Sequence, residues 1–392
     1  MISFFPADAR PSAQRETAPD AAAIPERRPP ARRVSQSILI HAVPEAGAPK
    51  AAPRSSRQFI CDPWFRLFPR FLWLLLPLIC GAPAARAQLE KFEETLNQAL
   101  TGDAKAQLRL GLFYEHGVGV LVNGLEAYKW YVKAAEQAEP TAQVLAGLLC
   151  DLGNGVPQDS TAAAKWYRRA AELKNPRGQF LLGLCYEKGS GVAADDVLAF
   201  AWFQKAAEQN FTDAQCKLAE CFARGRGVER DEAESAKWFR RAAELEDPEA
   251  QTQLGILYRN GQGVKPDDAT ALKWFGKAAA FGHAEAQFQL GVMHYGGLGV
   301  PQNSAEAAHW FLKAAQQDHA WAQHNLGVIY ERGKGVQADL AEAYKWFNLA
   351  ASAGLSYADD ARTALAARIS PKDLAEGQRR SKEFFRKRMP VE

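Results

Sequence analysis

A tryptophan recurs every 36 residues along most of this chain, and the spacing never changes. The seven copies are Trp130, Trp166, Trp202, Trp238, Trp274, Trp310 and Trp346. A fixed period in this range is typical of stacked-repeat folds, in which each unit packs only against its neighbours. Such folds present an extended surface, so the period favours a chain that holds a partner over one built around a single pocket.

Other positions of the period also keep their residues. A Gly-x-Gly-Val block stands before each tryptophan, first at Gly117, Gly119 and Val120, and an Ala-Ala pair begins four residues after each one. An Asp or Asn follows each block, at Asn123, Asp159, Asp195, Asp231, Asp267, Asn303 and Asp339. Seven copies that share all these positions define a tandem repeat.

Each repeat is predicted to form two helices. In the first copy, helix A would span 104–116, with its apolar residues at the i, i+4, i+7, i+8 spacing of one helical face. Gly117 would end it in the left-handed conformation. The Asx position would cap helix B, which would run to about residue 137. Gly111 becomes Ala219 in one copy and stays Gly in the other six, so a neighbouring helix is expected to approach closely there.

These positions together resemble the Sel-one-like repeat (SLR) family over about residues 104–357. The shared pattern is A-x-x-x-L-G-x-x-Y-x-x-G-x-G-V-x-x-D followed by A-x-x-W-[YF]-x-[KR]-A-A-E; Cys150, Phe222 and His294 depart from it at the Tyr. The resemblance implies an all-α solenoid, a right-handed superhelix of seven helical hairpins related to the tetratricopeptide repeats. It also implies roles in envelope assembly, signalling or host contact.

The first 87 residues form a different kind of sequence. Residues 1–57 are rich in Ala, Pro and Arg without periodicity, which predicts a disordered leader. Residues 58–87 are predicted to be a signal peptide, because Arg66 and Arg70 precede the apolar run 71–80 and Ala85-Arg86-Ala87 precedes Gln88. The run is shorter than the roughly 20 residues of a membrane span. The alternative is a short interfacial helix that stays attached as an anchor.

The signal segment predicts a secreted, periplasmic protein. The signal segment begins far from Met1, so we expect the first 55 or so residues to be an artefact of the assigned start codon. No methionine lies between Met1 and Met293, so a true start near the signal segment would use a codon other than ATG. The first 87 residues hold 12 of the 48 basic and 6 of the 45 acidic residues. The remainder therefore carries 36 basic against 39 acidic residues, and this balance argues against nucleic acid as a partner.

Both ends of the array are predicted to carry helical caps. Residues 88–103 would form an N-terminal helix whose apolar face is Leu89, Phe92, Leu96, Ala99 and Leu100. Residues 358–392 would form a last helix A and a final helix. The final helix would begin at a capping box, Ser370 to Asp373, and its apolar residues are Leu374, Phe384 and Phe385. Its many Arg and Lys residues would supply the polar outer face that a terminal unit needs.

The sequence offers no catalytic constellation. Cys150, Cys185, Cys216 and Cys221 are interpreted as buried small apolar residues, since equivalent positions of adjacent repeats lie about 10 Å apart, beyond disulfide reach. His283 and His319 are likewise one repeat apart, which argues against a metal site. The Ser-x-x-Lys motif of serine β-lactamases is missing from the sequence. We therefore expect no enzyme activity, no cofactor and no metal.

The predicted partner-binding surface follows helix A, which lines the concave face in related superhelices. One position of helix A gives a ladder that is polar in the last four repeats, and bulky residues lie beside it. The site residues are Arg109, Lys217, Gln253, Gln289 and Asn325, with Phe288 and Trp321. Amides at a regular spacing suit an extended peptide backbone or a sugar chain.

The sequence thus predicts a non-enzymatic protein-interaction scaffold of the bacterial cell envelope. Its partner would be a protein or peptide, with a glycan as a second possibility, and no membrane span would remain after signal cleavage. Two alternatives stay open. One is a hydrolase of cell-wall or β-lactam substrates, and the other is a glycan-binding component of polysaccharide export.

Overall fold

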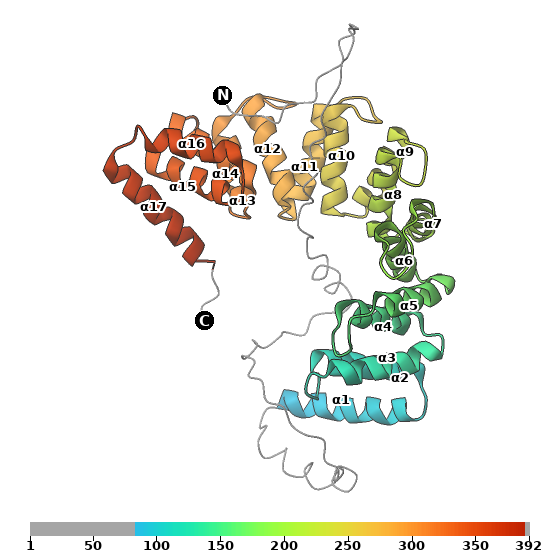
Figure 1. Ribbon diagram of the computed structural model, residues 1–392. Helices are drawn as coiled ribbons and strands as arrows, with labels where there is room; N and C mark the ends of the chain where they lie inside the picture. Colours follow the sequence, from blue (N-terminus) through green and yellow to red (C-terminus); the bar gives the residue numbers. More distant parts are fainter. Residues whose placement is uncertain (1–82, 389–392) are drawn as a thin grey trace. The chain divides into compact units, whose positions relative to one another are not determined.

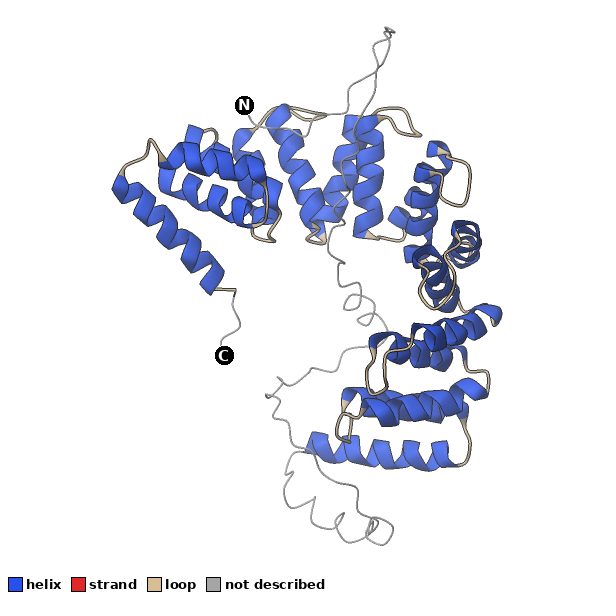
Figure 2. Cartoon of the chain, viewed as in Figure 1, coloured by secondary structure: helices blue, strands red, loops and turns tan. Residues whose placement is uncertain are grey.

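The computed structural model describes residues 83–388, and this part of the chain contains seventeen α-helices and no strand (Figures 1 and 2). The leader and most of the predicted signal peptide lie outside the described residues. Helices of the first half are α1 Pro83–Leu100, α2 Ala104–His116, α3 Gly124–Glu136, α4 Pro140–Leu152, α5 Ser160–Glu172, α6 Pro176–Lys188, α7 Asp196–Ala207 and α8 Thr212–Arg224. Those of the second half are α9 Glu232–Glu244, α10 Pro248–Asn260, α11 Asp268–Ala280, α12 Ala284–Gly296, α13 Ser304–Ala315, α14 Ala320–Arg332, α15 Leu340–Ser352, α16 Ser356–Ala366 and α17 Pro371–Arg386.

The even-numbered helices α2 to α14 are the seven A helices, and the odd-numbered helices α3 to α15 are the seven B helices. Each A helix packs against the B helix that follows it and against the helix that precedes it, which is α1 for α2 and a B helix for the others. The seven hairpins therefore stack in chain order, and the predicted all-α repeat solenoid is confirmed. The predicted bounds of the first helix A agree with α2, residue for residue.

The helix ends follow the predicted chemistry. Gly117 ends α2 at φ 74°, and the equivalent glycine ends every other A helix of the seven repeats in the same left-handed region. The side chain of Asn123 accepts a hydrogen bond from the backbone N–H of Glu126. The equivalent Asp or Asn caps each of the other six B helices in this way. These caps satisfy backbone N–H groups that a helix start leaves without partners.

A tyrosine or phenylalanine ring explains the small position in helix A. A Cβ atom added to Gly111 would lie 2.4 Å from Cε1 of Tyr131, the residue after the repeated tryptophan in the same hairpin. Five further glycines meet the equivalent ring in the same way, and Tyr131 itself is fully buried. The tryptophans are mostly only partly buried, and in six repeats a Lys or Arg three residues on lies over the indole, as Lys133 does over Trp130 at 3.7 Å.

A buried glutamine joins each repeat to the helix before it. Its Nε2 donates to the backbone carbonyl of the second Ala of the preceding Ala-Ala pair, as Gln143 does to Ala135 at 3.0 Å. The equivalent bonds to later Ala-Ala pairs come from Gln179, Gln215, Gln251, Gln287 and Gln323. Gln107 donates in the same way to the carbonyl of Ala99, which follows Gln98. The acceptor carbonyl also accepts the backbone N–H of the residue three positions on, as Ala135 does from Ala138, so the glutamine adds a second hydrogen bond that crosses from one repeat to the next.

A second glutamine completes this arrangement in only three repeats. Gln137, Gln209 and Gln317 each donate from Nε2 to Oε1 of the buried glutamine 30 residues earlier, at 2.8 Å. In the other repeats this position is Leu173, Leu245, Phe281 or Ala353. The matching Oε1 atoms, on Gln143, Gln215, Gln251 and Gln323, are buried and accept no hydrogen bond.

The terminal helices depart in detail from the predicted caps. Helix α1 begins at Pro83 and not at residue 88, and Leu100 is 65% exposed, so it does not belong to the apolar face. Phe385 is also exposed, whereas Phe384 packs edge-on against Trp346 at 5.6 Å. The predicted capping box is present, because Ser370 Oγ accepts from the N–H of Asp373 at 3.1 Å. Arg380 of α17 pairs with Asp339 and Glu342, so part of the basic face fixes the cap to α15.

Helices of the described residues are all too short or too polar to cross a membrane.

The unpaired amide oxygens give a test of the junction. We expect Leu245→Gln to raise the free energy of unfolding by about 1 kcal/mol, because its Nε2 can reach Oε1 of Gln215 and a buried acceptor would gain a partner. Leu245 is 49% exposed, so little apolar burial is lost. The measurement is thermal or denaturant unfolding followed by circular dichroism. The matched control is Gln209→Leu, which should lower the free energy of unfolding by a similar amount. A lower unfolding midpoint for Leu245→Gln than for the wild type would contradict the prediction.

Candidate functional site

The candidate site is called the helix-A face. It consists of two positions on each A helix from α2 to α14: the position of the predicted ladder, which is Arg109 in the first repeat, and the position three residues later, which is Leu112 there. In the first three repeats the later position is Leu112, Leu148 and Leu184, which are partly exposed. Arg109 is exposed on α2, and Lys217 and Gln253 are partly exposed on α8 and α10. Apart from the exposed Arg109, the face thus carries partly exposed leucines over α2, α4 and α6, and it turns charged at α8.

A group of four charged side chains marks this change. Glu187, at the end of α6, pairs with Lys217 Nζ at 3.7 Å and with Arg226 Nη1 at 3.2 Å. Lys217 also pairs with Glu220 at 3.0 Å. Burial lowers the pKa of Lys217, but the two carboxylates outweigh that effect and leave the pKa above its ordinary value. Lys217 therefore remains charged while it is partly covered.

Two Glu–His pairs connect the next three A helices. His319 Nδ1 accepts from the backbone N–H of Ala322 at 3.2 Å, so it caps α14, and Nε2 lies 2.9 Å from Glu285 on α12. His283 caps α12 in the same way and lies 3.1 Å from Glu249 on α10. Burial raises the pKa of Glu285, but the hydrogen bonds from His319 and Gln289 outweigh it and leave that pKa below its usual value.

Gln289 does not form part of an open ladder. It is 5% exposed, its Nε2 donates to Glu285 at 2.5 Å, and its Oε1 accepts from Arg259. Phe288 beside it is also buried, and its ring stacks on His319 with centroids 4.5 Å apart. These two side chains hold α10, α12 and α14 together, so the prediction of a solvent-facing pair is wrong for them.

Asn325 is likewise buried, at 1% exposure, and its Oδ1 accepts no hydrogen bond. Its neighbour His324 is 4% exposed, with an unpaired Nδ1, and burial lowers the pKa of this imidazole to about 4. Trp321 stays partly exposed and lies 5.8 Å from the exposed ring of Tyr357. Of the predicted site residues, Arg109, Lys217, Gln253 and Trp321 thus remain at the surface, and their role in binding stays a prediction.

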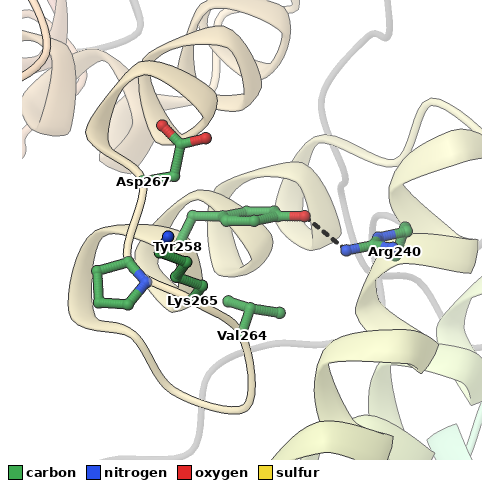
Figure 3. A pocket seen from close by; sticks show the side chains of 6 residues that line it. Arg240, Tyr258, Val264, Lys265 and Asp267 are labelled. Carbon is green, nitrogen blue, oxygen red and sulfur yellow. Dashed lines mark hydrogen bonds between the residues drawn. The ribbon is translucent and has the colours of Figure 1, made fainter.

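A surface hollow that the sequence did not predict lies on another part of the repeat. Its volume is about 450 Å³, and Tyr258, Arg240 and the loop from Val264 to Asp267 line it (Figure 3). Arg240 of α9 donates to the hydroxyl of Tyr258 on α10 at 2.5 Å, and Arg168 bonds Tyr186 in the same way two repeats earlier. The equivalent hollow beside Tyr330 is lined by Asp373 of α17. The hollow therefore recurs beside the equivalent tyrosine in two repeats.

The described cysteines lack the environment of a nucleophile. Cys150, Cys185 and Cys221 are buried and Cys216 is half-buried, and all four are free thiols. Burial raises the pKa of Cys185 and of Cys221 to about 11. Their thiols are protonated at neutral pH, whereas a reactive cysteine needs a lowered pKa. Within residues 83–388, no three His, Cys, Asp or Glu side chains gather as a metal site requires.

Substitutions in helix A should separate structural amides from surface amides. Gln289→Ala is expected to cost about 1–3 kcal/mol of stability, because it removes the partner of two charged groups and leaves them partly buried. Gln253→Ala should change stability by less than about 0.5 kcal/mol, since it loses only an exposed bond to Glu249. Thermal midpoints of the two variants decide the matter, and equal losses would refute the distinction.

His324 should make the fold sensitive to acid. Its folded-state pKa of about 4 lies below the ordinary 6.5, so the unfolded chain binds the proton more readily and stability falls as the pH drops from about 6.5 to about 4. We expect His324→Phe to flatten that part of a plot of unfolding midpoint against pH. His309→Asn removes an exposed histidine and serves as the control. An unchanged slope in His324→Phe would contradict this prediction.

Comparison with known proteins agrees with the repeat seen in the structure. The family model of the Sel1 repeat matches residues 104–139, 140–175, 176–211, 212–247, 248–283, 284–319 and 322–355. Among solved structures, the chain is similar to a Sel1 repeat protein from Oxalobacter formigenes, with 35% identity, a TM-score of 0.61 and coverage of 75% of this chain and 85% of that one.

The chain is also similar, at lower identity, to two further solved structures. One is c5321, a protective antigen with an SLR fold from uropathogenic Escherichia coli, with 26% identity, a TM-score of 0.40 and coverage of 76% of this chain and 95% of that one. The other is the immunity protein Pa5087 from Pseudomonas aeruginosa, with 18% identity, a TM-score of 0.37 and coverage of 55% and 81%. No curated protein matches the chain. On the seven matched repeats, which cover more than half of its residues, the chain belongs to the Sel1 repeat family.

Proposed function

We propose that this chain is a non-enzymatic scaffold of the bacterial cell envelope that binds a protein partner through the helix-A face of its first four repeats. Sel1 repeat proteins generally mediate protein–protein interactions. The observation that carries the proposal is the change along this face from the leucine row of α2, α4 and α6 to the charged group around Lys217. Envelope location rests on the signal segment read from the sequence.

The leucine row suits an apolar stretch of a partner. Leu148 and Leu184 pack their inner atoms against the buried cluster that contains Leu182 and Phe203, and their outer atoms stay partly exposed. Burial of such atoms on binding contributes about 25 cal/mol per Å² of apolar area. A partner segment with apolar residues followed by charged ones would match both parts of the face.

The charged group would then fix the register of the partner. Lys217 and Arg226 share Glu187, and a partner carboxylate could replace that shared acceptor at the partly exposed Lys217. Charged contacts at an interface edge govern orientation and rate of association more than total affinity. Repeats 6 and 7 have less to offer on this face, because Gln289 and Asn325 are buried there, whereas Lys217 is partly exposed.

The test is crosslinking in intact cells with a tag at the C-terminus, followed by capture from the periplasmic and cytosolic fractions. We expect Lys217→Glu to lower recovery of the crosslinked protein at least fivefold. Lys237→Glu is the matched control, because it makes the same change on an exposed B-helix surface, where Lys237 pairs only locally with Glu234.

Three results would count against the proposal. Equal recovery with both variants would place the binding surface elsewhere. Recovery from the cytosol alone would remove the envelope role. Capture of glycan without protein would favour the alternative of a glycan-binding protein. The neighbouring rings of Trp321 and Tyr357 could then serve as the aromatic surface that stacks on a sugar.

A further inference from the structure

The first helix keeps the register of the repeat although its sequence does not show the repeat pattern. Helix α3 spans 124–136, and one 36-residue period earlier lies the segment 88–100, which is the last 13 residues of α1. The turn after α1 also matches, because Gly102 has a positive φ, as do Ala138 and its equivalents in the following repeats. Residues 88–100 therefore form the B helix of an incomplete repeat that precedes the first one, and residues 101 and 102 form its turn.

The contacts of this segment are those of a B helix. Gln107 donates to the carbonyl of Ala99 at 3.2 Å, the bond that joins every later repeat to the helix before it. A Cβ added to Gly119 would lie 2.6 Å from the carbonyl oxygen of Gln88. Gly191, Gly227 and Gly263 approach the carbonyls of the first residues of α5, α7 and α9 in the same way. Gln88 is thus the first residue of the repeat array by both register and contact.

The five residues of α1 before Gln88 have no counterpart in a B helix. B helices are 12 or 13 residues long, whereas α1 has 18. The position just before Gln88 is the capping position, which is Asp or Asn in all seven repeats, but here it is Ala87. Ala is a poor cap, and replacing a capping Asp or Asn by Ala costs about 1 kcal/mol. When a repeat position loses its usual residue in one copy only, a different function is expected to require the new residue there.

We propose that the chain is cut between Ala87 and Gln88, so that the finished protein begins at the first residue of the array. The peptidase would be of the class that requires small side chains at the first and third positions before the bond, here Ala87 and Ala85. Water adds across the peptide bond, leaving a carboxylate on Ala87 and an amine on Gln88. The register of the array and the peptidase signature, which are independent of each other, give the same bond.

The cut must precede folding of this segment. In the structure the bond lies inside α1, whereas a protease needs an extended chain in its active site. Cleavage during export, before α1 forms, meets this condition. Loss of residues 83–87 removes none of the junction contacts, since Gln88, Phe92 and Ala99 remain.

The experiment expresses the full chain with a C-terminal tag in a Gram-negative bacterium and identifies the N-terminal peptide of the purified protein by mass spectrometry. We expect it to begin at Gln88, with or without loss of ammonia from the new terminal glutamine. Ala87→Phe should abolish that peptide. Ala84→Phe is the matched control, because it blocks the competing bond after Ala82-Pro83-Ala84 and should leave the start at Gln88.

A wild-type N-terminus at residue 85, or at any residue upstream of Gln88, would overturn the proposal, and so would a Gln88 start in Ala87→Phe. This inference goes beyond the binding role and is separable from it. The start of the chain is read from a peptide mass, whereas partner binding is read from crosslinking at Lys217, and either result can fail alone.

Discussion

The hydrogen bond from a buried glutamine to the end of the preceding B helix is the contact on which the array depends. A single helical hairpin cannot bury its apolar faces, so every repeat needs its neighbour. The glutamine of helix A donates a hydrogen bond to a carbonyl at the end of the preceding helix B, and this bond joins adjacent repeats at the same place each time. The constant period follows, since one inserted residue would move the amide away from its acceptor.

The same contact explains how the array ends. At the N-terminus, α1 supplies the carbonyl of Ala99, the close approach at Gln88 and the buried ring of Phe92. Its exposed Lys91, Glu94 and Gln98 replace the apolar positions of a B helix. At the C-terminus, Gly377 of α17 takes the place of the next loop, because a Cβ there would lie 2.9 Å from the carbonyl of Ala341. Each cap therefore imitates the missing neighbour at the contact surface and is polar beyond it.

The repeat made most of the fold predictable, but much of the helix-A face was not. Helix bounds, caps and the small position at Gly111 repeat every 36 residues, so aligned copies reveal them. The contacts that close the face in the later repeats have other spacings, 30 residues for Arg259 and Gln289 and 34 residues for Glu285 and His319. Comparison of equivalent positions cannot show such pairs, so Gln289 resembled a surface residue. The positions of Glu249 and Glu285, 34 residues before the two histidines, were the available signal.

These spacings also decide which part of the face can gain from a partner. A polar group that already has a good partner within the chain gains little from exchanging it for a group of a binding partner. The net free energy of the new hydrogen bond is the difference between the bound and the free state, and the group is bonded in both. In repeats 5 to 7, Glu249 and Glu285 are paired with His283 and His319 of the next repeat, so these groups gain little from a partner. In repeats 1 to 3 the same face offers partly exposed leucines, whose contact with water is unfavourable until something covers them. For this reason we place the proposed binding surface in the N-terminal repeats, with Lys217 at its boundary.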